Sequence, residues 1–574
     1  MAGAHTQTQD AQSAGASGQR PSLSPGLRLI GTRLFAPLAL VILCLAVFLP
    51  GQMSVPPLDR DEPRFAQASK QMAESGDYIN IHFLGDRRNN KPVGIYWLQS
   101  LAVKASGYGA EAPIWVYRSV SVVGATLAVL LTYWVGLAVM SSSASFVSAA
   151  LMGLTFIVTT EAHLAKTDAF LLASVVLAQG ALARLWLARN SEGSSWLLAA
   201  LFWVGLAVGT LLKGPIGLMI SGLTIVSLCL WKHEVRWLAR LRPLSGFILF
   251  LVLVLPWYVA IYRETNGGFF LDSIGRDLLA KVGEGQESHG APPLTHLLAG
   301  IVVFWPLSAF VVLAIPGVWR QRSADCVVFA LCWLVPSWIV FEFVSTKLPH
   351  YTMPLLPALA LMMGYVLVER GSWPKRAVLY WLAAGLLVAI PLLIFASSLA
   401  LPIYLQSWPS PPGVLIAFVG AVLGIMAAVR VKQRAILNAL WPVAGTSITL
   451  LLAFWAFVAP SLTPIWLSPR LVDVIEAGTS CENPSVITVG FNEPSYVFLL
   501  TSRVTLGNAE SAASFLSTTP ADPCKVATVE TAHAEAFENA AREAGVTLKQ
   551  IGSVSGININ GGDEQVIGVY LNGG

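Results

Sequence analysis

The chain has 574 residues, of which 55% are hydrophobic and 12% are charged, and its mean hydropathy is +0.65. A soluble domain has about a quarter of its residues charged, so this composition excludes a soluble protein and indicates an integral membrane protein. The formal net charge of +4 is small for the length. Because the basic residues lie in short loops between apolar runs, they indicate membrane topology rather than a nucleic-acid partner.

Residues 1–25 are rich in Ala, Gly, Ser and Gln without apolar periodicity, which is typical of a disordered tail. The tail is too long and too weakly charged for the start of a signal peptide, so the first apolar run is expected to remain as an uncleaved anchor.

Residues 26–461 are predicted to form an all-α polytopic membrane domain, because a span needs about 20 apolar residues and such runs recur throughout. We predict thirteen helices, at residues 33–50, 116–138, 143–160, 169–188, 195–212, 215–231, 244–262, 296–318, 326–345, 352–369, 377–399, 412–429 and 438–459.

Lys and Arg gather in alternate loops between these runs. Cytoplasmic loops carry an excess of Lys and Arg, so these loops are predicted to lie inside, together with the N-terminus. Three segments too long for turns then lie outside: residues 51–115, residues 263–295 and everything after residue 461.

The first outside segment contains "LDRDEPRFAQASKQMAESGDY" at residues 58–78, which predicts a helix lying on the membrane surface and ending at Gly76. A second such helix, apolar but short, is predicted from Lys91 to Gly107. In the first helix, Phe65, Ala66 and Met72 fall near one face, and Gln67, Lys70, Glu74 and Asp77 fall on others.

Asp59, Arg60, Asp61, Glu62 and Arg64 lie within six positions at the start of that first helix. One interpretation is structural, with Asp61 capping the helix that starts at the next residue. Capping does not need four more charges, so a functional interpretation stands beside it. The two are compatible.

Further acids and bases fall in the first outside segment and at the predicted outer ends of helices. They are Arg87, Arg88, Lys91, His163, Asp168, Lys213, Lys347, His350 and Tyr351. A single lysine there is explained by snorkelling, but together these residues resemble a site for an anion at the bilayer surface. Arg and Lys favour phosphate, so a lipid-linked phosphate is the expected ligand.

Residues 462–574 change character and predict a small water-soluble α/β domain. The runs "SVITVGF", "PSYVFLL", "CKVATVE" and "VIGVYLN" are typical of strands, and "NAESAASFLS" and "TAHAEAFENAAREAG" of helices. Cys481 and Cys524 lie in this domain, where two thiols suit a disulfide if the domain faces an oxidising compartment. Two unpaired thiols are the alternative.

Several motifs occur in an order that resembles one family: "DEPRFAQASKQMAESGDY", "KPVGIYWLQ", "AKTDAFLL", "LLKGPIGLM", "TKLPHYTMPLLPALALMMG" and "GFNEPSYVFLL". From about residue 33 the chain resembles the ArnT-like, aminoarabinose transferase branch of the bacterial integral-membrane glycosyltransferases, relatives of the protein O-mannosyltransferases. The resemblance implies the GT-C fold, with surface helices in the first outer loop and a periplasmic C-terminal domain. It also implies a bacterial inner-membrane enzyme that transfers a sugar from a polyprenyl phosphate to an extracytoplasmic acceptor.

The resemblance implies roles for individual residues. Asp61 of "DEPR" matches the acidic residue treated as catalytic, and Asp168 of "KTDA" matches a second acidic position. The expected donor-phosphate residues are Arg64, Lys91, Lys213, Lys347 and Tyr351, and the expected neighbours of the site are Glu62, His163, His289 and His350.

One departure from the family concerns a metal. Some relatives have a glutamate directly before the lysine of the "KP" motif, where this chain has Asn90. His163 and His289 remain candidate ligands, but no metal is predicted, and the polyprenyl-phosphate sugar is expected as a substrate rather than a cofactor.

Our hypothesis for the chemistry is that Asp61 acts on the acceptor, either by taking a proton from its hydroxyl or by orienting its phosphate. The cations neutralise the negative charge that grows on the leaving phosphate. One displacement with inversion is implied by the resemblance. A retaining reaction would need a second carboxylate about 5 Å away, for which Asp168 is the candidate. The acceptor is expected to be lipid A, lipopolysaccharide, another envelope glycan or a protein.

Two other classes of function are kept as alternatives. A lipid or sugar transporter should show internal repeats and ionisable residues near the middle of spans, and neither is evident. An interaction scaffold would explain residues 462–574 but not the outer charges. The Asp-x-Asp pattern at residues 59–61 is taken as accidental, because nucleotide sugars are cytoplasmic.

Overall fold

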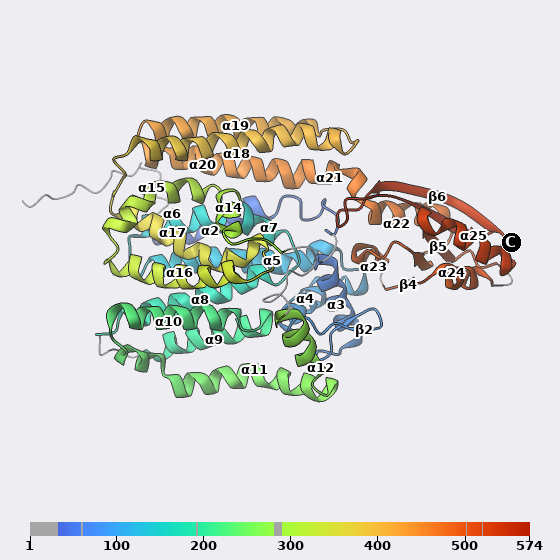
Figure 1. Ribbon diagram of the computed structural model, residues 1–574, viewed down its shortest axis with the longest axis horizontal. Helices are drawn as coiled ribbons and strands as arrows, with labels where there is room; N and C mark the ends of the chain where they lie inside the picture. Colours follow the sequence, from blue (N-terminus) through green and yellow to red (C-terminus); the bar gives the residue numbers. More distant parts are fainter. Residues whose placement is uncertain are drawn as a thin grey trace, which may run out of the picture.

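The computed structural model describes residues 32–58, 61–190, 193, 195–279, 290–500, 502–518 and 521–573. The predicted disordered tail, Asp59, Arg60 and His289 lie outside these residues. Within them, long apolar helices form a bundle with a small α/β unit at one end (Figure 1). We call that end of the bundle the domain end.

Nine helices of the described residues are long and apolar enough to cross a membrane. They are α5 (Ile114–Gly136), α8 (Asp168–Leu187), α9 (Trp196–Lys213), α11 (Pro243–Thr265), α16 (Asp325–Phe343), the span Pro349–Glu369, α18 (Ala377–Tyr404), α19 (Pro411–Lys432) and the span Ile436–Ser461. The span Pro349–Glu369 contains α17 (Leu356–Met363), and the span Ile436–Ser461 contains α20 (Ile436–Ala453).

Two bent helix pairs raise the number of spans in the described residues to eleven if each pair is one span. They are α6 (Ser142–Gly153) with α7 (Phe156–Ala162), bent by 64°, and α14 (Thr295–Val303) with α15 (Leu307–Arg320), bent by 116°. Two shorter apolar helices are α2 (Ala36–Phe48) and α10 (Ile216–Lys232). The predicted runs coincide with these helices, and the chain is an integral membrane protein.

Close packing of α8 against α9 brings two parts of the site together. A Cβ added to Gly205 of α9 would lie 2.9 Å from backbone atoms of Ser174 and Ala178 on α8, so the two backbones approach as small residues allow in membranes. Asp168 begins α8 and Lys213 ends α9. Because the chain runs in opposite directions along the two helices, these residues meet at the domain end.

The first large loop forms a surface layer at the domain end. Its helices α3 (Asp61–Ser75) and α4 (Gly94–Ser106) have 15 and 13 residues, too few to cross a bilayer. A two-stranded hairpin, β1 (His82–Phe83) with β2 (Asp86–Arg87), lies between them in sequence. Figure 1 shows α3, α4 and β2 on the side of the bundle that carries the C-terminal unit.

The C-terminal unit is built on a five-stranded sheet with the order β4-β3-β5-β7-β6. β3 runs parallel to β4 and β5, whereas β7 runs antiparallel to β5 and β6. The strands are β3 (Ser485–Val489), β4 (Val504–Leu506), β5 (Lys525–Glu530), β6 (Leu548–Ile557) and β7 (Glu564–Asn572), and the helices are α22 (Leu467–Gly478), α23 (Pro494–Leu499), α24 (Ala509–Leu516) and α25 (Ala534–Glu543). Cys481 and Cys524 form a disulfide. The domain boundary at residue 462 stays a prediction.

The expected strand "PSYVFLL" is wrong, because this run forms helix α23. Pro494 occupies its first turn, where proline lacks no needed hydrogen bond. The short turn of helix lets two aromatic side chains point to different cores: Tyr496 packs inside the C-terminal unit and Phe498 packs against the membrane domain. Tertiary contacts thus override the strand-like composition.

Phe498 is a buried contact between the C-terminal unit and the membrane domain. Its side chain is 3% exposed and packs with Ala66, Val103, Tyr117 and Ala165, which come from α3, α4, α5 and the loop before α8. The rings of Phe498 and Tyr117 meet edge to face with centroids 5.4 Å apart. One side chain therefore joins the unit to four parts of the domain end.

Two polar side chains of the surface helix α3 are buried where the C-terminal unit packs on it. Gln67 and Lys70 are 0% and 2% exposed. Gln67 donates a hydrogen bond to Ser502, and the Lys70 ammonium lies 5.2 Å from the centroid of Phe498. Burial lowers the pKa of Lys70 to about 8, although the nearby carboxylates of Glu74 and Glu111 oppose this shift.

We expect Phe498→Ala to lower the free energy of unfolding by about 3–5 kcal/mol, the usual cost of truncating a buried Phe. Thermal unfolding of the detergent-solubilised protein would measure this. Leu506→Ala is the control, since Leu506 is 44% exposed in the same unit. Equal effects of the two substitutions would contradict the proposed anchoring role.

The lowered pKa of Lys70 predicts a pH dependence. Above about pH 8 the folded chain releases a proton that the unfolded chain holds to about pH 10.5, so the unfolded state binds more protons and stability rises with pH in this window. Lys70→Met lacks the titrating ammonium group, so this contribution to the pH dependence of stability is absent from it. The thermal midpoint of the wild type should therefore rise relative to Lys70→Met from about pH 7.5 to about pH 10. A constant difference between the two proteins would refute the lowered pKa.

Candidate active site

The backbone on both sides of Asp61 is held by a buried ion pair between Glu62 and Arg118, each with 1% side-chain exposure. The Glu62 carboxylate accepts hydrogen bonds from Arg118 Nε (2.7 Å) and Nη2 (2.8 Å). It also accepts the backbone N–H groups of Leu58 (2.8 Å) and Ala165 (2.9 Å). Glu62 therefore joins the start of α3 to the chain before it and to the loop before α8.

The Arg118 guanidinium uses all five of its N–H donors. Besides its two bonds to Glu62, it donates to the carbonyl oxygens of Gln52 (3.0 Å), Val55 (2.7 Å) and Pro56 (2.9 Å). A guanidinium has five such donors, so none is left unsatisfied in the interior. Arg118 thus fixes the chain leading into α3 from a position on α5.

Asp61 lies at the start of α3 with its side chain exposed. Its charge acts on Lys166, a buried lysine in the loop before α8. Burial lowers the pKa of Lys166, but the carboxylates of Glu161, Asp168 and Asp61 outweigh this effect, so the pKa is raised. Lys166 is therefore charged at neutral pH and lies close enough to attract Asp61 electrostatically.

Lys166 belongs to a cluster of five ionisable residues from α7, the loop before α8, α8, α9 and the span Pro349–Glu369, three of them buried and two, Lys213 and His350, half-buried. We call it the charge cluster, and it consists of Glu161, Lys166, Asp168, Lys213 and His350.

Two ion pairs organise the charge cluster. Lys213 Nζ lies 2.5 Å from Asp168 Oδ1, and Lys166 Nζ lies 3.2 Å from Glu161 Oε1. The His350 ring lies between the two acids, 3.6 Å from Glu161 and 3.9 Å from Asp168. The second carboxylate oxygen of Glu161, Oε2, is buried without a hydrogen-bond partner in the described residues. With His350 neutral, the two acids balance the two lysines.

A second group of polar residues lies next to the charge cluster. The Tyr351 ring lies 5.5 Å from Lys213 Nζ and 6.5 Å from the His296 ring. His296 lies 3.7 Å from Glu342, and Lys347 donates to the Val344 carbonyl oxygen at 2.7 Å. Lys347 also acts electrostatically on His296.

Glu342 fixes the start of α14 beside this second group. Its carboxylate accepts the N–H groups of Leu294 (2.9 Å) and Leu297 (3.2 Å) and the indole N–H of Trp338 (3.2 Å). Glu342 therefore holds the bent pair α14 and α15 against α16.

Five of the predicted site residues meet at the domain end. Asp168, Lys213, His350 and Tyr351 lie together, and Asp61 reaches them through Lys166. Other predicted residues stand apart from this group in the contacts described. Arg64 is half-buried on α3 without an ion pair to the rest of the described chain, and Lys91 is half-buried ahead of α4, where it makes a polar or ring interaction.

His163 has a structural position. Its ring nitrogens lie 2.7 Å from the Thr159 carbonyl oxygen and 2.8 Å from that of Pro50, and the ring stacks on Trp455 at 4.1 Å. Burial lowers the pKa of His163 to about 4, with the two carbonyl contacts opposing this shift. The described residues contain no group of three His, Cys, Asp or Glu side chains arranged for a metal ion. The prediction that no metal is bound stays a prediction.

The sequence analysis missed Arg118, Glu161, Lys166 and Glu342. A usable signal was present for three of them, since Arg118 and Glu342 lie inside predicted apolar runs and Glu161 directly follows one, where an ionisable residue is costly and therefore paired or functional. Lys166 lies in the motif "AKTDAFLL" two positions before Asp168, but its contact with Glu161 depends on the bend between α7 and α8.

We expect Glu62→Gln to destabilise the protein by about 3–5 kcal/mol, because it leaves the Arg118 charge buried without its counter-ion. Glu476→Gln, at an exposed position of α22, is the matched control. Thermal unfolding in detergent measures both variants. If both unfold at the wild-type temperature, the ion pair does not hold the domain end together.

Comparison with known proteins supports the motif resemblance. Residues 34–267 match the family model described as dolichyl-phosphate-mannose-protein mannosyltransferase. Over 319 residues the chain is 30% identical to the undecaprenyl phosphate-alpha-4-amino-4-deoxy-L-arabinose arabinosyl transferase of Pseudomonas aeruginosa, which covers 54% of this chain and 55% of that protein. The chain thus spans about half the length of the curated relatives it matches.

The fold is shared over nearly the whole chain. The crystal structure of ArnT from Cupriavidus metallidurans in the apo state superimposes with a TM-score of 0.69 over 93% of this chain and 97% of that chain, at 16% identity. The same protein bound to undecaprenyl phosphate gives a TM-score of 0.68 over 92% and 97%, at 17% identity. The chain therefore has the fold of that protein over nearly its whole length, which confirms the fold expected from its motifs.

Proposed function

We propose that the chain is a glycosyltransferase that moves a sugar from a polyprenyl-phosphate donor to an acceptor at the membrane surface. The observation that carries the proposal is the approach of Asp61 to a charge cluster assembled from three distant parts of the chain. The proposal is supported by the relative from Pseudomonas aeruginosa, whose name states transfer of aminoarabinose from undecaprenyl phosphate.

Lys213, Lys347 and Arg64 are proposed to bind the donor phosphate, together with Lys91 and Tyr351. A lysine has three N–H donors, so Lys213 can bind Asp168 and still donate to a phosphate oxygen. Positive charge beside the bridging oxygen lowers the energy of the transition state, in which that oxygen gains negative charge. Asp168 would position Lys213, rather than act on the sugar itself.

Asp61 is proposed to act on the acceptor. Its carboxylate is exposed while the adjacent Glu62 is fully bonded, so of these two acids only Asp61 has oxygens available to a substrate. It would accept the proton of an acceptor hydroxyl, or orient an acceptor phosphate, in one displacement that inverts the sugar carbon. Asp168 is engaged with Lys213, which argues against its use as the nucleophile of a retaining reaction.

The domain end is proposed to face the periplasm of a bacterial inner membrane. The loops at the opposite end carry the basic residues expected inside, among them Lys232, Arg236, Arg240, Arg320 and Arg322. The disulfide of the C-terminal unit also suits an oxidising compartment. The proposed acceptor is lipid A or lipopolysaccharide, with another envelope glycan or a protein as the broader class.

We expect Asp61→Asn to reduce transfer at least about 100-fold, the usual contribution of a general base, without loss of folded protein. Asp473→Asn, at an exposed position of α22, is the control. The assay supplies polyprenyl-phosphate aminoarabinose and lipid A to the purified protein in lipid nanodiscs, and mass spectrometry detects the added sugar.

Two outcomes would contradict the proposal. Transfer by Asp61→Asn at the wild-type rate would remove the proposed role of that carboxylate. If the wild type transfers no sugar but speeds movement of the lipid-linked sugar across vesicles, the transporter alternative holds instead.

A further inference from the structure

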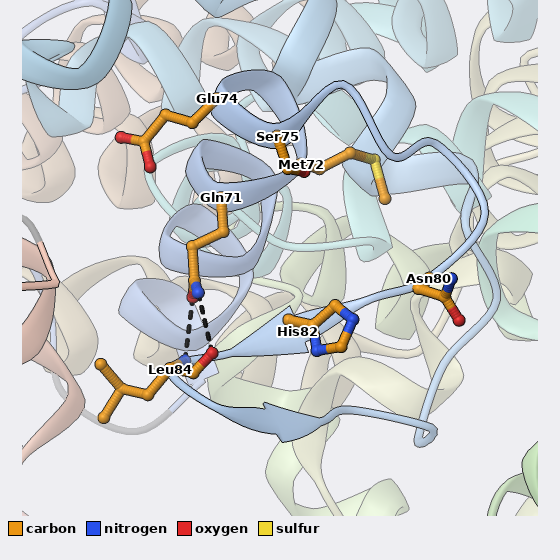
Figure 2. A pocket seen from close by; sticks show the side chains of 7 residues that line it. All are labelled: Gln71, Met72, Glu74, Ser75, Asn80, His82 and Leu84. Atoms are coloured by element: carbon orange, nitrogen blue, oxygen red, sulfur yellow. Dashed lines mark hydrogen bonds between the residues drawn. The ribbon is translucent and has the colours of Figure 1, made fainter.

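Several segments at the domain end are fixed by side chains that bond backbone groups elsewhere in the chain. Figure 2 shows one such tie in the first outside segment, where the Gln71 amide donates to the Leu84 carbonyl oxygen and accepts the Leu84 N–H, both at 2.9 Å. Glu62 ties the chain before α3 to the loop before α8 in the same way. A third tie, made by Glu342, differs because Lys347, a proposed donor-phosphate residue, follows closely in the chain.

Glu342 stabilises the start of a helix on another part of the chain. Its Oε2 accepts the Leu294 N–H at 2.9 Å and its Oε1 accepts the Leu297 N–H at 3.2 Å, and both groups lie at the start of α14. Leu294 is the N-cap residue and has no side-chain oxygen to cap the helix itself. Its φ of 74° is an unfavourable, left-handed conformation for leucine, which persists only where the surrounding structure holds it.

His296 of α14 ties the helix to the residue that follows Lys347. The His296 Nε2 lies 3.2 Å from the Leu348 carbonyl oxygen, and because a carbonyl oxygen only accepts, Nε2 carries the proton and donates it. The His296 side chain is 1% exposed, and its other ring nitrogen lies 3.7 Å from Glu342. The two ties therefore lie side by side.

The residues before Lys347 are tied to the chain that leads into α14. Gly290 and Thr346 form an antiparallel bridge, and the Ala291 N–H donates to the Ser345 carbonyl oxygen at 3.4 Å. The backbone is thus held on both sides of Lys347 by one stretch of chain, residues 290–297.

The Lys347 side chain is itself directed by a hydrogen bond. It is buried, and its ammonium donates to the Val344 carbonyl oxygen at the end of α16 at 2.7 Å. A lysine has three N–H donors, so this bond leaves further donors for a ligand. A ligand need not immobilise a lysine that is already fixed, and this lowers the entropic cost of binding.

We propose that Glu342 and His296 are positioning residues for the donor phosphate and that they act through Lys347. They hold residues 290–297 against the backbone around Lys347, so its ammonium is in place before the lipid binds. This inference rests on the proposed function, since it takes the donor phosphate as the ligand of Lys347. If the ties served stability alone, their loss would lower the free energy of unfolding and leave the affinity for phosphate unchanged.

The test measures how much the phosphate group adds to lipid binding. The purified full-length protein in lipid nanodiscs is titrated with polyprenyl phosphate and, separately, with the polyprenol of the same length. The ratio of the two dissociation constants is the phosphate preference. We expect Glu342→Gln to lower this preference about tenfold, the effect of weakening one hydrogen bond to a charged group, because the glutamine places an amide N–H against a backbone N–H.

Glu369→Gln is the matched control. Glu369 also accepts a backbone N–H beside a helix start, that of Ser141 before α6, at 2.9 Å. It lies at the opposite end of its span from His350 and Tyr351, so the variant should keep the wild-type phosphate preference. His296→Phe retains a ring but loses the N–H donor, and it should lower the preference as Glu342→Gln does. It supplies the same test if Glu342→Gln does not fold.

A double-mutant cycle shows whether Glu342 acts through Lys347. Lys347→Met should lower the phosphate preference at least as much as Glu342→Gln does. Adding Glu342→Gln to Lys347→Met should then cause no further loss, because residues that act as one unit are not additive. Additive losses would contradict the proposed route through Lys347.

Binding and transfer together separate the two proposals. If the wild type transfers sugar but Glu342→Gln and His296→Phe keep its phosphate preference, the positioning inference fails and the transferase stands. If the wild type transfers no sugar, the proposed function fails, and the titrations alone decide whether Glu342 and His296 position Lys347 for a lipid phosphate. Equal affinity of the wild type for the two lipids would overturn the positioning inference.

Discussion

Arg118 lies within a membrane helix, where an uncompensated charge is costly, and Glu62 together with three backbone carbonyl groups satisfies all five of its N–H donors. Each carboxylate oxygen of Glu62 also accepts a backbone N–H, one from Leu58 and the other from Ala165. The start of α3, the chain before it and the loop before α8 are thereby fixed to α5. Asp61 and Lys166 lie on two of these fixed segments, so their proximity follows from a pair that takes no part in the chemistry.

Neutrality is the second constraint on the domain end. Like charges in a low-dielectric interior repel strongly, yet the proposed reaction needs several cations near one phosphate. The structure meets both conditions by giving Lys213 and Lys166 a carboxylate each. The lysines are held in place and keep further N–H donors for a ligand. Within the described part of the chain, one buried oxygen of Glu161 is left without a hydrogen-bond partner.

The C-terminal unit is part of the same construction. Phe498 lies in one apolar cluster with residues of α3, α4, α5 and the loop before α8, so the unit packs against the helix that begins at Asp61. Leu84 and Phe83 of the hairpin also pack against its core. Helix α3 therefore connects two features, the exposed carboxylate at its start and the docked unit along its side.

The sequence determined the membrane helices, since runs of apolar residues must be helical to satisfy their backbone in lipid, and the ordered motifs pointed to Asp61, Asp168, Lys213 and Tyr351. It did not determine which charges pair. The motif "DEPR" assigned the catalytic role to Asp61 and placed Glu62 beside the site, but only the tertiary structure gives Glu62 its own role, because Arg118, 56 residues away, binds Glu62. Likewise α23 has strand-like composition but is helical, because Phe498 packs on another domain. Long-range pairing and docking depend on residues far apart in the chain, so local pattern carries no information about them.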